Sequence, residues 1–261
     1  MPDARRSAAR RAWVPLTAVA VAIAAVCALA AWRPWSQPAP ASAGAEAAEI
    51  APAPLVLPDH ARVLVFGDSW TYGSAAAPPT LGYAHLLADL LDAEVIVDGV
   101  RGSGYLKPGI DGPSFGDRIR ALDPSLEPDL IILQGSINDR RLYPAGYVDA
   151  VSAAWDDLAE RFPRATVVVL GPAPQVLPVE RPTAAIDADL ARLAAARSWW
   201  YISPLRDDWI TPDNYLEVID TGPGNDHPST AGHAYLAGRL TEALAALAEG
   251  TDVAADAPSM P

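Results

Sequence analysis

From Ala61 onward, short β-rich runs alternate with amphipathic stretches, and this alternation most strongly limits how the chain can fold. The runs predicted as strands are residues 62–66, 94–97, 130–133, 166–170 and 199–202. The stretches predicted as helices are residues 81–91, 147–162, 182–197 and 229–249. Strands that alternate with helices in this way indicate an α/β domain with a parallel sheet and helices on both faces.

Polar groups follow three of these strands and precede the last helix. Ser69 follows the first strand within Gly-Asp-Ser, Gly102 follows the second, Asn138 follows the third, and His227 comes just before the final helix. Because ligands of open α/β sheets bind at the carboxyl ends of the strands, we expect these groups to meet at one edge. A hydroxyl nucleophile, an imidazole base and N–H donors are the groups that ester hydrolysis requires.

In this order, Ser69 in G-D-S, Gly102, Asn138 in N-D and His227 in H-P resemble the four signature blocks of SGNH (GDSL-type) hydrolases. The resemblance spans residues 63–247 and implies a three-layer α/β/α, flavodoxin-like fold with a five-stranded parallel sheet. It also implies serine esterase, lipase or carbohydrate O-deacetylase activity without a metal. On this resemblance, Ser69, Gly102 and Asn138 form the oxyanion hole, and His227 activates Ser69.

The sequence departs from the family pattern at two positions. Ser136 occupies the position of the glycine in the usual G-x-N-D block, and Gly224 occupies the position of the acid three residues before the histidine. The residue that orients the imidazole is therefore open. We predict Asp226; the alternatives are Asp220 or a backbone carbonyl, as in a catalytic dyad.

The N-terminal segment has the features of an export or anchor sequence. Arginines precede an uncharged run over residues 12–32, which as a helix would match the hydrocarbon core of a bilayer. We predict a membrane anchor or signal segment over 1–33, a Pro/Ala-rich linker over 34–60, the hydrolase-like domain over 61–249 and a disordered tail over 250–261. An uncleaved anchor is favoured over cleavage after an A-x-A site at residues 41–43, and either outcome exports the domain.

Composition excludes several other classes of function. The net charge of −13 and the lack of a basic patch argue against nucleic-acid binding. Cys27, the only cysteine, cannot form an intramolecular disulfide, and the four scattered histidines have no metal-ligand spacing. We therefore predict no metal and no cofactor, and expect structural or surface roles for the other histidines, His60, His85 and His233.

These observations predict an extracytoplasmic serine esterase that acts on small acyl esters of glycans or lipids. An acyltransferase that uses the same residues, and a non-catalytic binding domain with a relic site, are the alternative hypotheses. The sequence indicates nothing about oligomeric state. Trp70, Tyr72 and Tyr105 are expected either to rim the pocket or to pack in the core.

Overall fold

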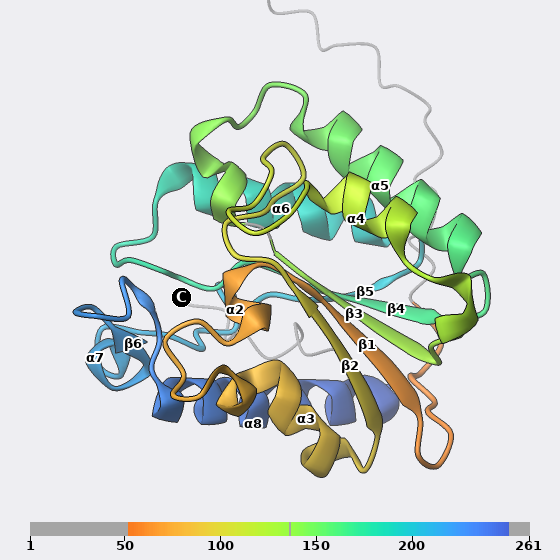
Figure 1. Ribbon diagram of the computed structural model, residues 1–261, viewed down its shortest axis with the longest axis horizontal. Coiled ribbons are helices and arrows are strands. Elements are labelled where there is room, and N and C mark those ends of the chain that lie inside the picture. The colour runs from red at the N-terminus through yellow and green to blue at the C-terminus, as the bar shows by residue number, and fades with distance from the viewer. Residues whose placement is uncertain (1–51, 136, 251–261) are drawn as a thin grey trace, which may run out of the picture. The chain divides into compact units, whose positions relative to one another are not determined.

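The computed structural model describes residues 52–135 and 137–250. Its centre is a five-stranded parallel sheet of order β2-β1-β3-β4-β5 (Figure 1). The strands are β1 (Arg62–Gly67), β2 (Glu94–Gly99), β3 (Leu130–Gln134), β4 (Thr166–Leu170) and β5 (Trp200–Ile202). All five predicted strands are therefore present, and the predicted α/β class with a five-stranded parallel sheet is confirmed.

Helices cover both faces of this sheet. On one face lie α4 (Phe115–Ala121), α5 (Tyr147–Arg161) and α6 (Arg181–Ala195); on the other lie α3 (Tyr83–Leu91) and α8 (Thr230–Ala248) (Figure 1). Short elements complete the domain: α2 (Ser69–Tyr72), α7 (Tyr215–Val218), three 3-10 turns (Pro79–Leu81, Pro124–Leu126 and Ile137–Arg141) and the antiparallel pair β6 (Ile219–Asp220) and β7 (His227–Pro228). The sequence pattern did not indicate α2, α4, α7 or the β6–β7 pair.

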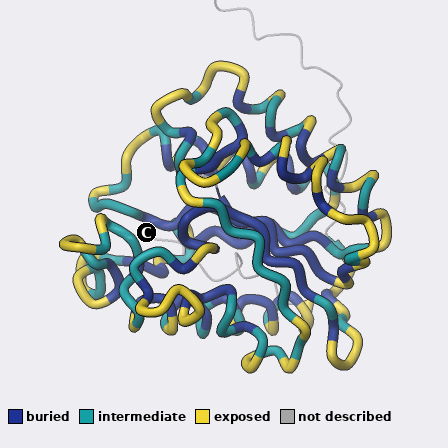
Figure 2. The backbone as a smooth tube through the Cα atoms, in the orientation of Figure 1, coloured by how far each residue is buried: buried dark blue, intermediate teal, exposed yellow. Residues whose placement is uncertain are grey.

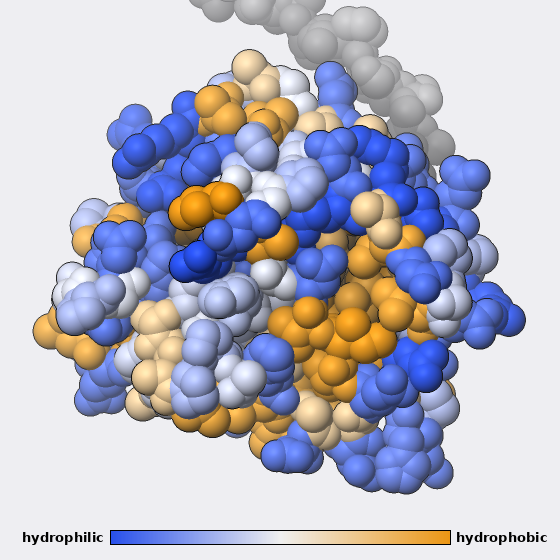
Figure 3. All heavy atoms as spheres, viewed as in Figure 1, coloured by the Kyte–Doolittle hydropathy of each residue, from blue (hydrophilic) through white to orange (hydrophobic). Residues whose placement is uncertain are grey.

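The central strands consist mainly of buried apolar residues, because helices cover both faces of the sheet. Figure 2 shows these strands as the buried centre of the domain. In β1, Val63 and Val65 pack toward α3 and α8, whereas Leu64 and Phe66 pack toward α4 and α5. Burying each such side chain contributes about 1.5–3 kcal/mol of transfer free energy. The edge strand β2 is only partly covered, and Figure 3 shows apolar side chains gathered over it.

The predicted anchor, linker and tail lie largely outside the described residues. The regular elements run from Arg62 to Ala248. Within the described part of the chain, no helix is long and apolar enough to cross a bilayer.

Candidate active site

Ser69 is the first residue of α2, directly beyond the carboxyl end of β1. The preceding Asp68 caps this short helix, because its Oδ1 accepts a hydrogen bond from the N–H of Trp70 at 2.9 Å. Gly67 is required at the strand end: a Cβ there would lie 2.2 Å from Oγ1 of Thr71 and 2.4 Å from Oε1 of Gln134. The Gly-Asp-Ser sequence is therefore a tight strand-to-helix turn that holds the hydroxyl in a defined position.

His227 meets this hydroxyl from the other end of the domain. Its Nε2 lies 2.8 Å from Oγ of Ser69, across 158 residues of sequence. Its Nδ1 lies 3.0 Å from the carbonyl oxygens of both Gly224 and Asn225. Since carbonyl oxygens only accept hydrogen bonds, Nδ1 is protonated and donates a hydrogen bond to them. Nε2 is therefore unprotonated and can accept the proton of Ser69.

The turn between β6 and β7 aims these two carbonyls at the ring. Asn225 and Asp226 both adopt left-handed backbone conformations, with φ of 52° and 61°. The N–H of Asp226 donates to the carbonyl of Asp220 at 2.9 Å, and Oδ1 of Asp220 accepts from the N–H of Gly222 at 2.9 Å. Asp220 therefore holds the turn closed rather than contacting the imidazole.

The carboxylate of Asp226, predicted to orient His227, is not among the hydrogen-bond partners of the ring in the described part of the chain. Among the described residues, neither Asp226 nor Asp220 hydrogen bonds to the ring, and backbone carbonyls occupy Nδ1 instead. This arrangement matches the dyad alternative rather than the Asp226 expectation. An aspartate at position 224 would not fit without rearrangement, because a Cβ there would lie 2.6 Å from Cβ of Asp220 and 2.8 Å from Cβ of Ala75.

The two remaining predicted site residues are carried on the loops after β2 and β3. Gly102 adopts a left-handed conformation with φ of 73°, which glycine accommodates without strain. Asn138 lies in the 3-10 turn after β3, and its Nδ2 donates to the carbonyl of Ser103 at 2.9 Å and to Oδ2 of Asp68 at 3.3 Å. Both residues line the same cleft as Ser69 and His227, a cavity of about 430 Å³.

Asp68 is a buried acid directly beneath this site. Burial raises the pKa of its carboxyl to about 6, partly offset by the hydrogen bond from Trp70 and by the nearby His227 and Arg118. Its own N–H donates to Oε1 of Gln134 at 3.2 Å. The polar groups around Asp68 therefore tie the serine turn to the end of β3.

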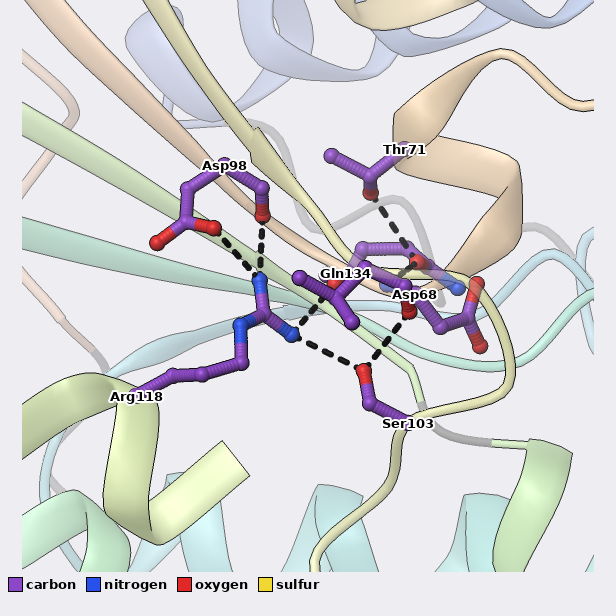
Figure 4. A network of polar contacts seen from close by, with 8 residues as sticks. Asp68, Thr71, Asp98, Ser103, Arg118 and Gln134 are labelled. Atoms are coloured by element: carbon purple, nitrogen blue, oxygen red, sulfur yellow. Dashed lines mark hydrogen bonds and ion pairs between the residues drawn. The ribbon is translucent and has the colours of Figure 1, made fainter. Parts of the chain in front are cut away.

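Arg118 supports the same turn from α4, as Figure 4 shows. Its guanidinium donates to the Gly67 carbonyl at 2.8 Å, to Oγ of Ser103 at 2.9 Å, and to the carbonyl and Oδ1 of Asp98 at 2.6 and 2.8 Å. It also lies 4.1 Å from the ring centroid of Phe66. One buried cation thus joins the ends of β1 and β2 to the Gly102 loop.

Sequence reasoning missed Arg118 and the role of Asp139. The buried carboxylate of Asp139 accepts from the N–H groups of Tyr105 and Leu106 at 2.7 and 3.0 Å, which joins the loops after β2 and β3. Its adjacency to Asn138 was the available signal. Arg118 gave no signal, because an arginine in a short polar segment is usually solvated.

The aromatic residues near the serine divide between two roles. Trp70 and Tyr105 are buried in the core, whereas Tyr72 is 38% exposed, with the guanidinium of Arg101 5.3 Å from its ring centroid. His233 is fully buried, and its Nδ1 accepts from the N–H of Tyr83. Within residues 52–135 and 137–250, no group of three or more acidic, histidine or cysteine side chains is arranged to hold a metal ion.

The chain is similar in sequence to a known family of proteins. A model of the GDSL-like Lipase/Acylhydrolase family matches residues 65–235. The chain is 30% identical over 190 residues to GDSL lipase Rv0518 of Mycobacterium tuberculosis, covering 68% of this chain and 79% of that protein.

Solved structures share the fold. They include Est24, a carbohydrate acetylesterase from Sinorhizobium meliloti (TM-score 0.57, 18% identity, 72% of this chain and 99% of that chain). A family two carbohydrate esterase from Cellvibrio japonicus is also similar (TM-score 0.54, 22% identity, covering 75% of this chain and 63% of that chain).

Proposed function

The chain belongs to the GDSL-like lipase/acylhydrolase family, and from this premise we propose that it hydrolyses small acyl esters through Ser69 and His227. The observation that carries the proposal is the 2.8 Å contact between Nε2 of His227 and Oγ of Ser69, with Nδ1 facing two carbonyls. This is the tautomer that a general base needs.

In the first half of the reaction, Oγ of Ser69 bonds to the ester carbonyl carbon while its proton passes to Nε2 of His227. The oxyanion accepts hydrogen bonds from the N–H groups of Ser69 and Gly102 and from Nδ2 of Asn138, which gives up its longer, 3.3 Å hydrogen bond to Oδ2 of Asp68. The bond to the leaving alcohol then breaks, and the alcohol takes the proton from Nε2. An acyl-enzyme on Ser69 remains.

In the second half, water replaces the alcohol. Nε2 of His227 accepts a proton from this water, whose oxygen attacks the acyl carbon. The bond to Oγ of Ser69 breaks as the serine recovers the proton, and the acid is released. The Nδ1–H of protonated His227 donates to the carbonyls of Gly224 and Asn225, and the nearby Asp68 attracts the ring's charge without hydrogen bonding to it. A dyad of this kind remains catalytically competent without the third residue.

Glycan O-acetyl groups and lipid esters are the proposed substrate classes. The carbohydrate esterases among the structural neighbours support the glycan class, and the GDSL lipase relative supports the lipid class. We further propose that the enzyme acts at the cell envelope, attached through residues 1–33 or secreted after cleavage. Sequencing the N-terminus of the mature protein distinguishes the two, because a start at Gly44 means cleavage.

The direct test is labelling of Ser69 by a fluorophosphonate together with turnover of p-nitrophenyl esters from acetate to octanoate. We expect Ser69→Ala to abolish labelling and to lower kcat by at least about 10³-fold. Ser125→Ala, an exposed serine at the opposite edge of the sheet, is the matched control. Neither labelling nor turnover in folded wild-type protein would overturn the proposal. Product analysis with an added sugar acceptor separates hydrolysis from acyl transfer.

A further inference from the structure

The cleft that contains Ser69 and His227 has an unusual charge for this protein. The whole chain carries a net charge of −13, with 32 acidic residues. Nevertheless, the described residues that line the cleft include four cationic side chains and no aspartate or glutamate. The four are Arg101, Lys107, Arg140 and Arg141.

Two of these cations are neutralised by carboxylates from outside the cleft lining. Nε of Arg101 lies 2.6 Å from Oδ2 of Asp111, and Nε of Arg140 lies 2.7 Å from Oε2 of Glu180. These ion pairs hold the two guanidinium groups in place. The charge that is available to a ligand must therefore come mainly from elsewhere in the lining.

Lys107 and Arg141 supply that charge. Both are exposed, and neither forms an ion pair with any residue in the described part of the chain. Most other arginines of the domain do form ion pairs, such as Arg164 with Glu127 at 2.7 Å. Lys107 is also the only lysine of the sequence. Two unpaired cations thus flank a nucleophile in a molecule that is otherwise strongly acidic.

We infer that the ester taken by this cleft carries an anionic group, a carboxylate or a phosphate, which Lys107 and Arg141 bind while Ser69 attacks. The inference rests on the proposed esterase function and narrows its substrate class. The net charge of the protein repels anions, so the attraction of an anionic ester to the active site depends on the positive lining of the cleft. The contact is exposed to solvent, so it contributes selectivity and depends on salt.

The test compares esters that differ only in charge. One pair is the same monoacetate of methyl galactoside and of the methyl glycoside of galacturonic acid, whose carboxylate is free. The other pair is monoacetyl glycerol and its phosphate monoester, which tests the phosphate. For at least one pair we expect kcat/KM to be about tenfold higher for the anionic ester at about 50 mM salt, and nearly equal at about 500 mM.

Substitutions then assign the preference to the cleft. Lys107→Gln and Arg141→Gln should each lower the ratio of anionic to neutral kcat/KM by about two- to fivefold. Arg164→Gln removes an equal charge from an exposed position outside the cleft lining, and it should leave the ratio unchanged. A ratio at or below one for both pairs, or a ratio that falls equally in Arg164→Gln, overturns the inference.

A binding measurement separates failure of this inference from failure of the esterase proposal. If no ester is turned over, the proposed function fails, and calorimetry with the methyl glycoside of galacturonic acid and with glycerol phosphate still tests the cationic site. Binding that is lost in the Lys107→Gln/Arg141→Gln double variant supports the site. The absence of binding of either compound to the wild-type protein overturns it. Turnover of the neutral esters alone leaves the esterase intact and rejects the anionic class.

Discussion

Protonation of His233 should destabilise the domain at acidic pH. The imidazole is fully buried on α8, where Nδ1 accepts from the N–H of Tyr83 at 3.1 Å and Nε2 therefore donates to the carbonyl of Ser74 at 3.0 Å. Burial lowers the pKa of His233 from 6.5 to about 4. The neutral ring is the form that the folded state accepts, so its contribution to stability is complete above pH 6.5 and falls as the pH approaches 4.

The magnitude follows from the difference between the two pKa values. Integrating the linkage relation predicts a loss of about 2 kcal/mol between pH 7 and pH 5, and about 3 kcal/mol by pH 4. Other groups titrate over the same range, and Asp68 opposes the loss because burial raises its pKa to about 6. A matched variant is therefore needed to isolate the histidine.

His233→Asn provides this comparison. An asparagine can offer an acceptor near the Nδ1 position to the Tyr83 N–H, and it does not titrate. The free energy of unfolding is measured by urea denaturation of both proteins at pH 7, 5 and 4. We expect the wild-type advantage at pH 7 to shrink by about 3 kcal/mol at pH 4. A difference that stays constant within about 0.5 kcal/mol across this range would refute the assignment of a depressed pKa to a buried neutral ring.

Three further substitutions test the site. Asp226→Asn should reduce kcat by less than about threefold, because backbone carbonyls orient His227. A loss of about 10⁴-fold, as for the carboxylate of a catalytic triad, would show that Asp226 does orient the ring. Asn138→Ala should lower kcat by about 10²- to 10³-fold with a smaller change in KM, measured on p-nitrophenyl acetate, and a loss below about threefold would remove it from the oxyanion hole. Arg118→Met should reduce the free energy of unfolding by about 1–3 kcal/mol in urea denaturation, because the Gly67 carbonyl loses this donor and the partly exposed Asp98 loses its ion-pair partner; an unchanged midpoint would contradict this.

The strands could be predicted because burial on both faces leaves a direct trace in the sequence. A continuous apolar run such as residues 130–133 has few alternatives when turn residues flank it. The helix α4 could not be predicted, because it spans only seven residues and has only two buried apolar side chains, Phe115 and Ile119. Its third buried residue, Arg118, is one that sequence patterns assign to solvent.

The candidate site was predictable to the extent that it depends on strand ends. Ser69, Gly102 and Asn138 follow strands of one parallel sheet, so their convergence follows from topology. The partner of Nδ1 was not predictable in the same way. That partner depends on the left-handed conformations of Asn225 and Asp226, which turn two carbonyls toward the ring. The residue types of this turn do not by themselves specify its backbone conformation.

The two halves of the Ser69–His227 contact have different supports. Ser69 directly follows strand β1 of the central sheet, whereas His227 belongs to the small antiparallel pair β6–β7. The six-residue connection of this pair, 221–226, orients the imidazole toward Ser69. Insertions or exchanges in this connection would therefore retune the base while leaving the hydrophobic interior untouched. For protein engineering, the connection between β6 and β7 is therefore the place where the position of the catalytic base can be varied without changing the central sheet.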